Sequence, residues 1–477
     1  MAAFEWRVLS SLTKVFPDEE LQAEEVIRGS ALRGEVFSFQ VAYRAAQLLK
    51  SVRIDVRSDL KDLITVRTVG LVPSEMPAYP DHDDRILRAM PGLYPDPLYP
   101  LGEEGVDIPH GQWRSVWITV ALQENTAPGV HDIEVVFVSP GGEVLGNAHF
   151  ALEVLPAVLP EQRLIHTQWF HCDCLAAYYQ VDVFSEAHWA LIERYVAEAA
   201  AHGINMILTP LFTPPLDTAV GGERPTVQLV DVEKTGDTYR FGFDRLERWI
   251  RMCRNNGIRY FEFSHLFTQW GAKHAPKIVA AVDGELKKIF GWETEAAGDD
   301  YRRFLDQFLP ELVAFIKRHG LEACSYFHIS DEPALRDIEH YAAAAEIVHR
   351  HLAEFPVIDA LSDYAFYEKG LVKHPIPAND HIEPFLEHGV PNLWTYYCCC
   401  QYKEVSNRFF NMPSTRNRIL GMQLFKFNIA GFLQWGYNFW YTQYSKRAID
   451  PFRVTDAGLA FPSGDAFAVY PGSDGPL

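Results

Sequence analysis

The fold of this chain is indicated most clearly by one stretch, Cys324-Ser325-Tyr326-Phe327-His328-Ile329-Ser330-Asp331-Glu332-Pro333. It begins as a short apolar run of β type and ends at two adjacent carboxylates, after which the apolar spacing becomes helical. Pro333 disfavours the α region for Glu332 and suits the first turn of a helix, so both acids are expected in the turn between the two elements. Catalytic residues of α/β barrels lie there, at the carboxyl ends of the strands. The pair therefore predicts a catalytic site; the alternative is an N-cap Asp331 beside a solvated Glu332.

The same order of strand, loop and helix repeats over residues 158–447. Strands are expected at 164–170, 205–209, 260–265, 325–330, 357–361, 372–376, 393–398 and 432–435. Apolar residues between them recur at helical spacing, as Trp189, Ile192 and Val196 do, and Gly203 follows the last such position of that helix. Eight is the strand number of a TIM-type barrel, so we expect a central (β/α)8 catalytic barrel over 158–447.

The chain before this region has a different pattern. Residues 1–157 alternate apolar and polar positions in several runs separated by turns, which predicts an N-terminal β-sandwich domain. Residues 88–100 interrupt it with four prolines, too many for a strand, and we expect a loop that packs against the next domain. Residues 448–477 are expected to form a short, partial C-terminal β segment. The fold class is thus multidomain, α/β plus all-β.

Composition limits the partners. The chain has 477 residues, a formal charge of −20 and 13% aromatic residues, so a nucleic-acid partner is excluded and a neutral ligand such as a sugar is favoured. Its seven cysteines do not form a disulfide framework, which favours a reducing compartment. The chain shows no export leader and no apolar run of about 18 residues, so a cytoplasmic protein without a membrane partner is expected. A secreted form from which the leader had been removed would look the same.

Aromatic and polar residues follow the ends of the predicted strands and would meet on one face. Aromatic planes stack on the C–H faces of sugar rings, whereas for each residue taken singly the alternative is packing in the core. The predicted substrate-binding residues are Trp169, His265, Trp270, Asp359, Tyr396, Tyr397, Trp435, Asn438 and Trp440.

The adjacency of Asp331 and Glu332 indicates a mechanism. Retaining glycosidases hold two carboxyl groups about 5–5.5 Å apart across the scissile bond, and inverting ones about 6.5–9.5 Å apart. Neighbouring residues have Cα atoms about 3.8 Å apart and approach from one side. This favours substrate assistance, in which the sugar's own 2-acetamido oxygen attacks C1. Glu332 would then be the acid/base and Asp331 would orient the amide.

A family resemblance agrees with this interpretation. Ser330-Asp331-Glu332-Pro333 after a fourth strand, together with Val116–Val120, Gln434–Asn438 and Tyr470-Pro471-Gly472, resembles glycoside hydrolase family 123, the β-N-acetylgalactosaminidases. The resemblance implies an exo-acting, retaining enzyme that needs no cofactor and removes a terminal β-linked N-acetylgalactosamine through an oxazolinium intermediate. It implies Glu332 as acid/base, Asp331 as the stabilising aspartate, and Tyr396 or Tyr397 as donor to the acetamido carbonyl.

Three alternatives remain open at this stage. One is a retaining glycosidase for another sugar such as N-acetylglucosamine, and another is a carbohydrate-binding protein without catalysis. The third is a zinc hydrolase, but its soft ligands lack the usual metal-binding spacing, so no metal is predicted. Those ligands would be His171, Cys172, Asp173, Cys174, His265 and Cys398 to Cys400. His328 is expected to be a core histidine, and the sequence does not indicate the oligomeric state.

Overall fold

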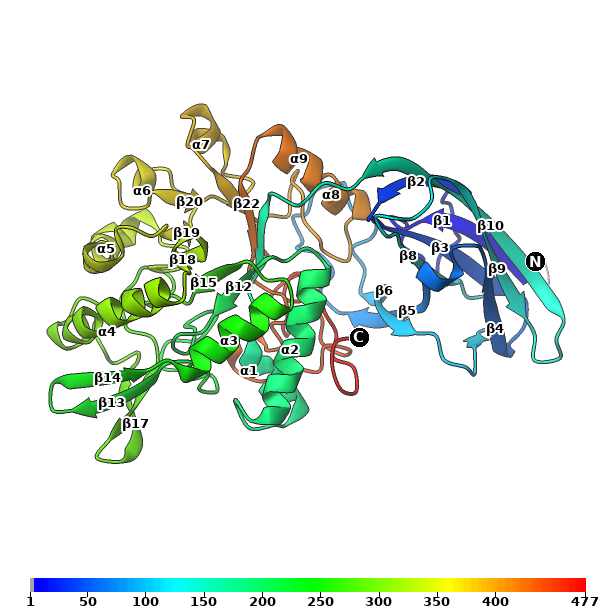
Figure 1. The fold of residues 1–477 in the computed structure, drawn as a ribbon. Coiled ribbons are helices and arrows are strands. Elements are labelled where there is room, and N and C mark those ends of the chain that lie inside the picture. Colours follow the sequence, from blue (N-terminus) through cyan, green and yellow to red (C-terminus); the bar gives the residue numbers. More distant parts are fainter. Residues whose placement is uncertain (1–3) are drawn as a thin grey trace.

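The structure, a computed structural model, describes residues 4–477 and contains two five-stranded sheets at its N-terminal end (Figure 1). The first sheet has the strand order β1 (Phe4–Ser10), β3 (Val36–Ala45), β8 (Arg114–Ala121), β5 (Ile64–Ser74) and β6 (Gly92–Pro100). The second has the order β2 (Arg28–Arg33), β10 (Val144–Val158), β9 (Gly129–Val138), β4 (Leu49–Arg57) and β7 (Val106–Ile108).

The two sheets share one apolar core. Val41 and Val116 of the first sheet belong to the same buried cluster as Val135 of the second, and the rings of Phe39 and Phe150 stack at 4.1 Å between them. Successive side chains of a strand point to opposite faces, so one buried face per sheet accounts for the alternation in the sequence.

Residues 92–100 form a strand, β6, and the prediction of a loop there was wrong. β6 pairs with β5 alone and lies at the edge of its sheet, where prolines such as Pro95 are tolerated because no further strand needs their missing N–H. The expected packing against the following part of the chain is present: the rings of Tyr94 and Phe410 stack at 6.1 Å, and those of Tyr99 and Phe452 at 6.0 Å.

All eight strands predicted for the second region are present; seven are shorter than predicted, and the last, β22, has the predicted length but begins one residue earlier. Six make one parallel sheet in the order β18 (Ser325–Phe327), β15 (Tyr260–Phe263), β12 (Met206–Thr209), β11 (Ile165–Gln168), β22 (Gly431–Gln434) and β21 (Trp394–Tyr396). The other two, β19 (Ile358–Ala360) and β20 (His374–Ile376), pair with each other. Isolated parallel bridges join Phe327 to Val357 and Ala378 to Tyr396, so backbone contacts link the pair to both edges of the larger sheet.

Helices surround these strands with their apolar faces inward, as Trp189, Ile192 and Val196 of α2 illustrate. None of the helices within residues 4–477 combines the length and the apolar character that crossing a membrane requires. The α-helices are α1 (Cys172–Tyr179), α2 (Glu186–Ala201), α3 (Asp244–Asn255), α4 (Asp299–Arg318), α5 (Ile338–Leu352), α6 (Ala365–Glu368), α7 (Glu383–Glu387), α8 (Ser414–Arg418) and α9 (Leu420–Lys426). Short 3-10 turns lie at Lys61–Leu63, Glu322–Cys324, Leu335–Asp337 and Gln443–Ser445.

A further four-stranded sheet was not predicted from the sequence. Its order is β14 (Thr238–Gly242), β13 (Asp231–Thr235), β16 (Ile278–Val282) and β17 (Glu285–Phe290). Its two hairpins come from the long connections that follow β12 and β15, and Figure 1 shows them projecting at the periphery below α4.

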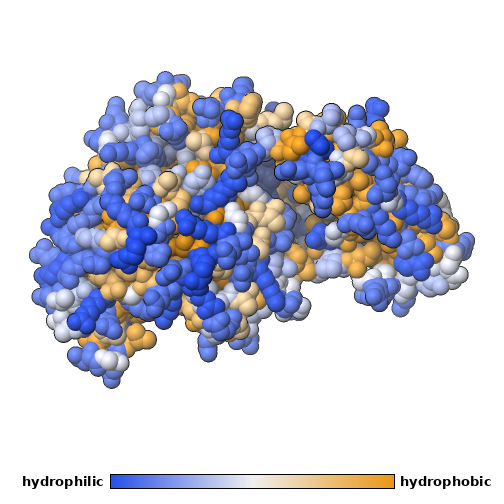
Figure 2. Space-filling model, in the orientation of Figure 1, coloured by the Kyte–Doolittle hydropathy of each residue, from blue (hydrophilic) through white to orange (hydrophobic). Residues whose placement is uncertain are grey.

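The C-terminal segment, residues 448–477, contains isolated bridges but no strand, and the prediction of a β segment there was wrong. Several of its apolar residues, Phe467 and Tyr470 among them, are buried against the rest of the protein rather than in a sheet. A Cβ on Gly436 would lie 2.2 Å from the carbonyl oxygen of Ala466, so glycine is what allows the segment to approach the end of β22. Figure 2 shows a mainly polar face with a hollow between the N-terminal sheets and the rest of the molecule.

Candidate active site

The adjacent acids lie in an irregular turn after β18, which a neighbouring loop and the end of β19 hold by backbone hydrogen bonds. The N–H of Trp270 donates to the carbonyl of Asp331 at 2.7 Å, and the N–H of Glu332 donates to that of Ala360 at 3.0 Å. Glu332 has a φ of +43°, a conformation that costs a glutamate free energy and that is found preferentially at functional sites. Asp331 caps no helix, since the N-cap of α5 is Asp337.

Both carboxylates open into a cavity of about 230 Å³. Six of the predicted site residues line it, and several further residues from the surrounding loops complete its wall. The predicted ones are Trp169, Trp270, Asp331, Glu332, Tyr396 and Trp435; the others are Leu216, Asp217, Gln269, Ala360, Cys398, Cys399, Cys400, Leu433, Gln443, Tyr444 and Phe461.

The environment of the two acids favours their protonated forms. Burial, and next the negative charge of Glu332, raise the pKa of Asp331 well above its ordinary value. Burial also raises the pKa of Glu332, against the opposing effect of a hydrogen bond from Tyr396. Two such neighbouring carboxyls can keep a proton near neutral pH, as a general acid must.

Tyr396 contacts the acid pair directly, whereas its neighbour does not. The hydroxyl of Tyr396 donates to Oε1 of Glu332 at 2.6 Å. Tyr397 points away from the cavity, and its hydroxyl donates to Oδ1 of Asn417 at 3.1 Å. Side chains of a strand alternate in direction, so only one of two consecutive tyrosines at the end of β21 can reach the cavity.

The other predicted binding residues are buried outside the cavity wall. Asn438 bonds to the backbone of His171, and the ring of Trp440 packs on that of Tyr195 at 5.8 Å. His265 and Asp359 both lie beneath the cavity, next to His328. Their place at a strand end was predicted, but the direction of their side chains was not.

His328 is a core histidine, as predicted, and it joins three strands. Nε2 lies 2.5 Å from Glu262 and Nδ1 lies 3.0 Å from Asp359, whose other oxygen accepts from Tyr341. Burial alone would lower the pKa of His328, but the hydrogen bonds with Asp359 and Glu262 outweigh this and raise it to about 9. The resulting cation lies beneath the acid pair and opposes the rise in the pKa of Asp331.

Asp217 is a cavity residue that the sequence did not reveal. Oδ2 accepts from the N–H of Tyr444 at 2.9 Å, and burial raises the pKa of Asp217 to about 6. Gln269 fixes the same loop through a 2.5 Å hydrogen bond from the N–H of Asp217. Asp217 follows a Pro-rich connection well beyond the end of β12, and no motif marks it.

Behind the cavity wall, Asp465 of the C-terminal segment positions Trp435. The indole N–H of Trp435 donates to Oδ2 of Asp465 at 3.0 Å. Burial raises the pKa of Asp465 to about 7, although the charge of Arg408 opposes this. Arg408 donates to the carbonyl oxygens of Asp465 and Gly436 and so fixes the segment against the end of β22. This role was also missed, because the tail carries no motif.

The soft ligands considered in the sequence do not come together as one site. Asp173 is paired with Arg224 at 2.7 Å, and Cys174 accepts from the N–H of Trp440. Within residues 4–477, two groups of potential ligating atoms are close enough to share an ion: Cys398 with Cys399 and Cys400, and His265 with His328 and Asp359. All seven cysteines are free.

Comparison with known proteins identifies the family of the chain. The family model of the glycoside hydrolase 123 catalytic domain matches residues 169–477. A family 123 glycoside hydrolase from Clostridium perfringens, from a structural analysis of glycolipid glycan hydrolysis, has the same fold: the TM-score is 0.77 at 15% identity, over 99% of this chain and 84% of that one. A β-glucuronidase from Parabacteroides merdae reaches a TM-score of only 0.28 at 10% identity, over 91% of this chain and 47% of that one, which supports no argument.

No curated protein sequence matches the chain. The family model nevertheless spans well over half of the residues, and its match contains the acid pair and every residue of the cavity wall. The chain therefore belongs to glycoside hydrolase family 123 and is a glycosidase.

Proposed function

We propose that this glycosidase removes terminal β-linked N-acetylgalactosamine by retaining, substrate-assisted catalysis. The observation that carries the proposal is the placement of Asp331 and Glu332, side by side in one turn and facing one cavity. Two acids so placed approach a bound sugar from the same side, so neither is placed to attack from the opposite face, which favours a nucleophile supplied by the substrate.

In the first step the acetamido oxygen of the substrate attacks C1 while the bond from C1 to the leaving oxygen breaks. Glu332 gives its proton to that oxygen. Asp331 accepts a hydrogen bond from the amide N–H and so stabilises the positive charge that develops on this nitrogen as the oxazolinium ring forms. Water then adds to C1, Glu332 takes its proton back, and the ring reopens. Two inversions at C1 leave the β configuration unchanged.

The cavity wall supports a sugar ligand. Trp169, Trp270 and Trp435 present aromatic surface to it, and the carboxyl of Asp217 offers an acceptor for a sugar hydroxyl. Of the two tyrosines expected near the acetamido carbonyl, Tyr396 is the one that lines the cavity. We extend the proposal to glycolipid glycans as a substrate class, which the Clostridium perfringens relative suggests.

The proposal includes the architecture that holds the site. We propose that the eight central strands act as one closed (β/α)8 barrel over residues 158–447, preceded by a β-sandwich domain over residues 1–157. The two isolated bridges at β19 and β20 support closure, because they connect both edges of the six-stranded sheet to the strand pair.

Hydrolysis of three p-nitrophenyl β-glycosides tests the function: the N-acetylgalactosaminide, the N-acetylglucosaminide and the galactoside without an acetamido group. We expect the first to be cleaved best and the galactoside at least about 100-fold more slowly, since it lacks the internal nucleophile. NMR of the anomer formed first should show β product. Equal cleavage of the galactoside, or α product, would refute substrate assistance; preference for the glucosaminide would replace only the choice of sugar.

A further inference from the structure

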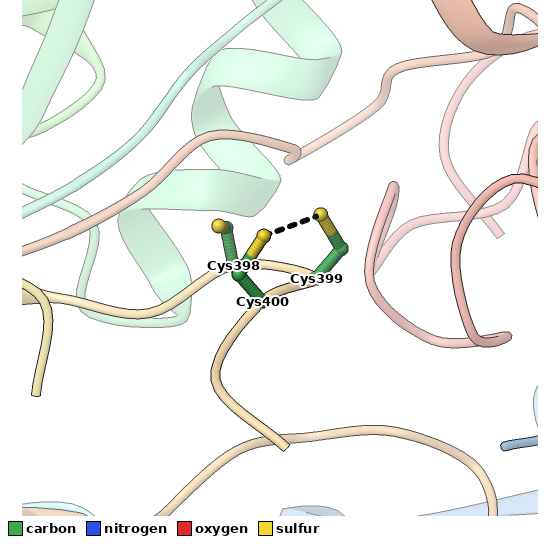
Figure 3. Close-up of side chains that lie close together, drawn as sticks. All are labelled: Cys398, Cys399 and Cys400. Atoms are coloured by element: carbon green, nitrogen blue, oxygen red, sulfur yellow. Dashed lines mark hydrogen bonds between the residues drawn. The ribbon is translucent and has the colours of Figure 1, made fainter. Parts of the chain in front are cut away.

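Three consecutive cysteines form one side of the cavity wall directly after β21. Cys398 is buried, Cys399 is half-buried and Cys400 is exposed. Their sulfur atoms all lie within 4.8 Å of one another, and those of Cys399 and Cys400 are 3.8 Å apart. Figure 3 shows the three sulfurs on the same side of the loop, an arrangement that the turn at Cys399 and Cys400 makes possible.

We propose that Cys398, Cys399 and Cys400 bind one thiophilic metal ion of the Zn²⁺ class, and that the bound ion inhibits the glycosidase. The separations fit such an ion. A tetrahedral zinc ion with Zn–S bonds of about 2.3 Å holds two thiolates about 3.8 Å apart. Cys399 and Cys400 already have this spacing, and Cys398 needs only a small movement.

Disulfide formation competes poorly for these thiols. A disulfide needs Cα atoms about 4.4–6.8 Å apart, whereas consecutive residues have theirs about 3.8 Å apart. Neither Cys398 with Cys399 nor Cys399 with Cys400 meets this condition. Two of the three possible disulfides are therefore disfavoured, and thiols that stay reduced are soft ligands, which select zinc and copper(I) over magnesium or calcium.

The position of the cluster connects metal binding to catalysis. The Sγ of Cys398 lies 3.9 Å from Oε1 of Glu332, and it also donates to Oε1 of Gln401 at 3.2 Å. An ion held by the three sulfurs would occupy part of the cavity and bring a carboxylate oxygen of Glu332 within reach as a fourth ligand. Inhibition rests on the proposed role of Glu332, whereas binding of the ion does not.

Titration with CdCl2 under reducing conditions tests the site, read by the ultraviolet charge-transfer absorption of cadmium thiolates. We expect saturation at one Cd²⁺ per chain. The double variant Cys399→Ser, Cys400→Ser should bind Cd²⁺ more than about 100-fold more weakly, because it loses two of three ligands. Cys324→Ser, which changes a half-buried thiol outside the cavity, should titrate like the parent protein. The single variant Cys400→Ser changes only the exposed position, so its weaker binding of Cd²⁺ tests the site if the double variant does not fold.

An activity assay on the same samples tests the inhibition. Cd²⁺ should abolish turnover of the parent protein and of Cys324→Ser, chelation should restore it, and the double variant should keep its own rate when Cd²⁺ is added. An unchanged charge-transfer titration in the double variant would overturn the metal site. Saturation at one equivalent without inhibition would overturn the connection to catalysis. A protein that binds Cd²⁺ but cleaves no 2-acetamido sugar even when metal-free would refute the proposed function and leave the thiol site standing.

Discussion

At the scale of single residues, the two acids have different expected roles that substitution can separate. Glu332→Gln removes the proton donor, so substrates with poor leaving groups should lose about 10²–10⁴-fold in rate, and activated aryl glycosides much less. Asp331→Asn removes the partner of the amide, so rates should fall for both kinds of substrate. Steady-state kinetics on one alkyl and one aryl glycoside would measure this, with the exposed Glu339→Gln as control. Full activity of Asp331→Asn would contradict the assignment.

The hydrogen bond from Tyr396 to Glu332 predicts a shift in the pH profile. The bond stabilises the ionised carboxylate and lowers the pKa of Glu332. Tyr396→Phe should therefore raise that pKa, and the basic limb of kcat/KM, where the general acid loses its proton, should move to higher pH.

Tyr397→Phe is the matched control for this shift, since it removes a buried hydroxyl from the adjacent residue without touching the acid pair. Its basic limb should stay in place. A limb that moves equally in both variants, or moves to lower pH in Tyr396→Phe, would rule out the proposed effect of the Tyr396 hydroxyl.

At the scale of elements, His328 ties β15, β18 and β19 together beneath the site. His328→Ala leaves Glu262 and Asp359 buried without the cation between them, and should cost about 3–5 kcal/mol in the free energy of unfolding. The exposed His202→Ala should change it by less than about 0.5 kcal/mol. Urea denaturation measures both, and a loss below about 1 kcal/mol in His328→Ala would contradict the role.

The same histidine predicts a pH dependence of stability. Its pKa is about 9 in the folded protein and about 6.5 in the unfolded chain, so the folded state binds more protons between these values. The stabilisation is complete below about pH 6.5 and is lost as the pH rises through 9, by about 3 kcal/mol. The free energy of unfolding of the parent protein should fall across this window, and that of His328→Ala should fall less.

Strands and helices were predicted correctly where apolar periodicity dominates the sequence. They were missed where their place in the tertiary structure decides the conformation. Buried strands such as β12 and amphipathic helices such as α2 carry strong apolar periodicity, which the burial of one face imposes. β6 was mistaken for a loop because its prolines are acceptable only at a sheet edge, and an edge position depends on strand order. The hairpins β13–β14 and β16–β17 were missed because they lie within long connections.

At the scale of the whole molecule, an ion pair fastens the N-terminal part to the second region. Arg416 of α8 binds Asp83 through two hydrogen bonds of 2.9 and 2.8 Å, and both side chains are largely shielded from solvent. Asp83→Asn should cost about 3 kcal/mol in the free energy of unfolding, because it leaves the guanidinium without a counter-charge.

Asp81→Asn provides the comparison for this pair. Asp81 lies two residues away and pairs with Lys403 in an exposed position, where solvent screens the charges, so its loss should lower the free energy of unfolding much less than the loss of Asp83. Urea denaturation of both variants would measure the difference. Equal effects would show that burial of the Arg416 pair contributes nothing to the junction.

The sequence by itself determined where the eight central strands lie and the position of Asp331 and Glu332 at the end of one of them, because these follow from local apolar spacing and turn chemistry. Only the tertiary structure decided which side chains reach the cavity. It separated Tyr396 from Tyr397, placed His265 and Asp359 beneath the site, and brought in Asp217 and Asp465 from segments without a motif. The physical reason is that side-chain direction and long-range approach depend on how loops from distant strands pack together, which no local pattern records.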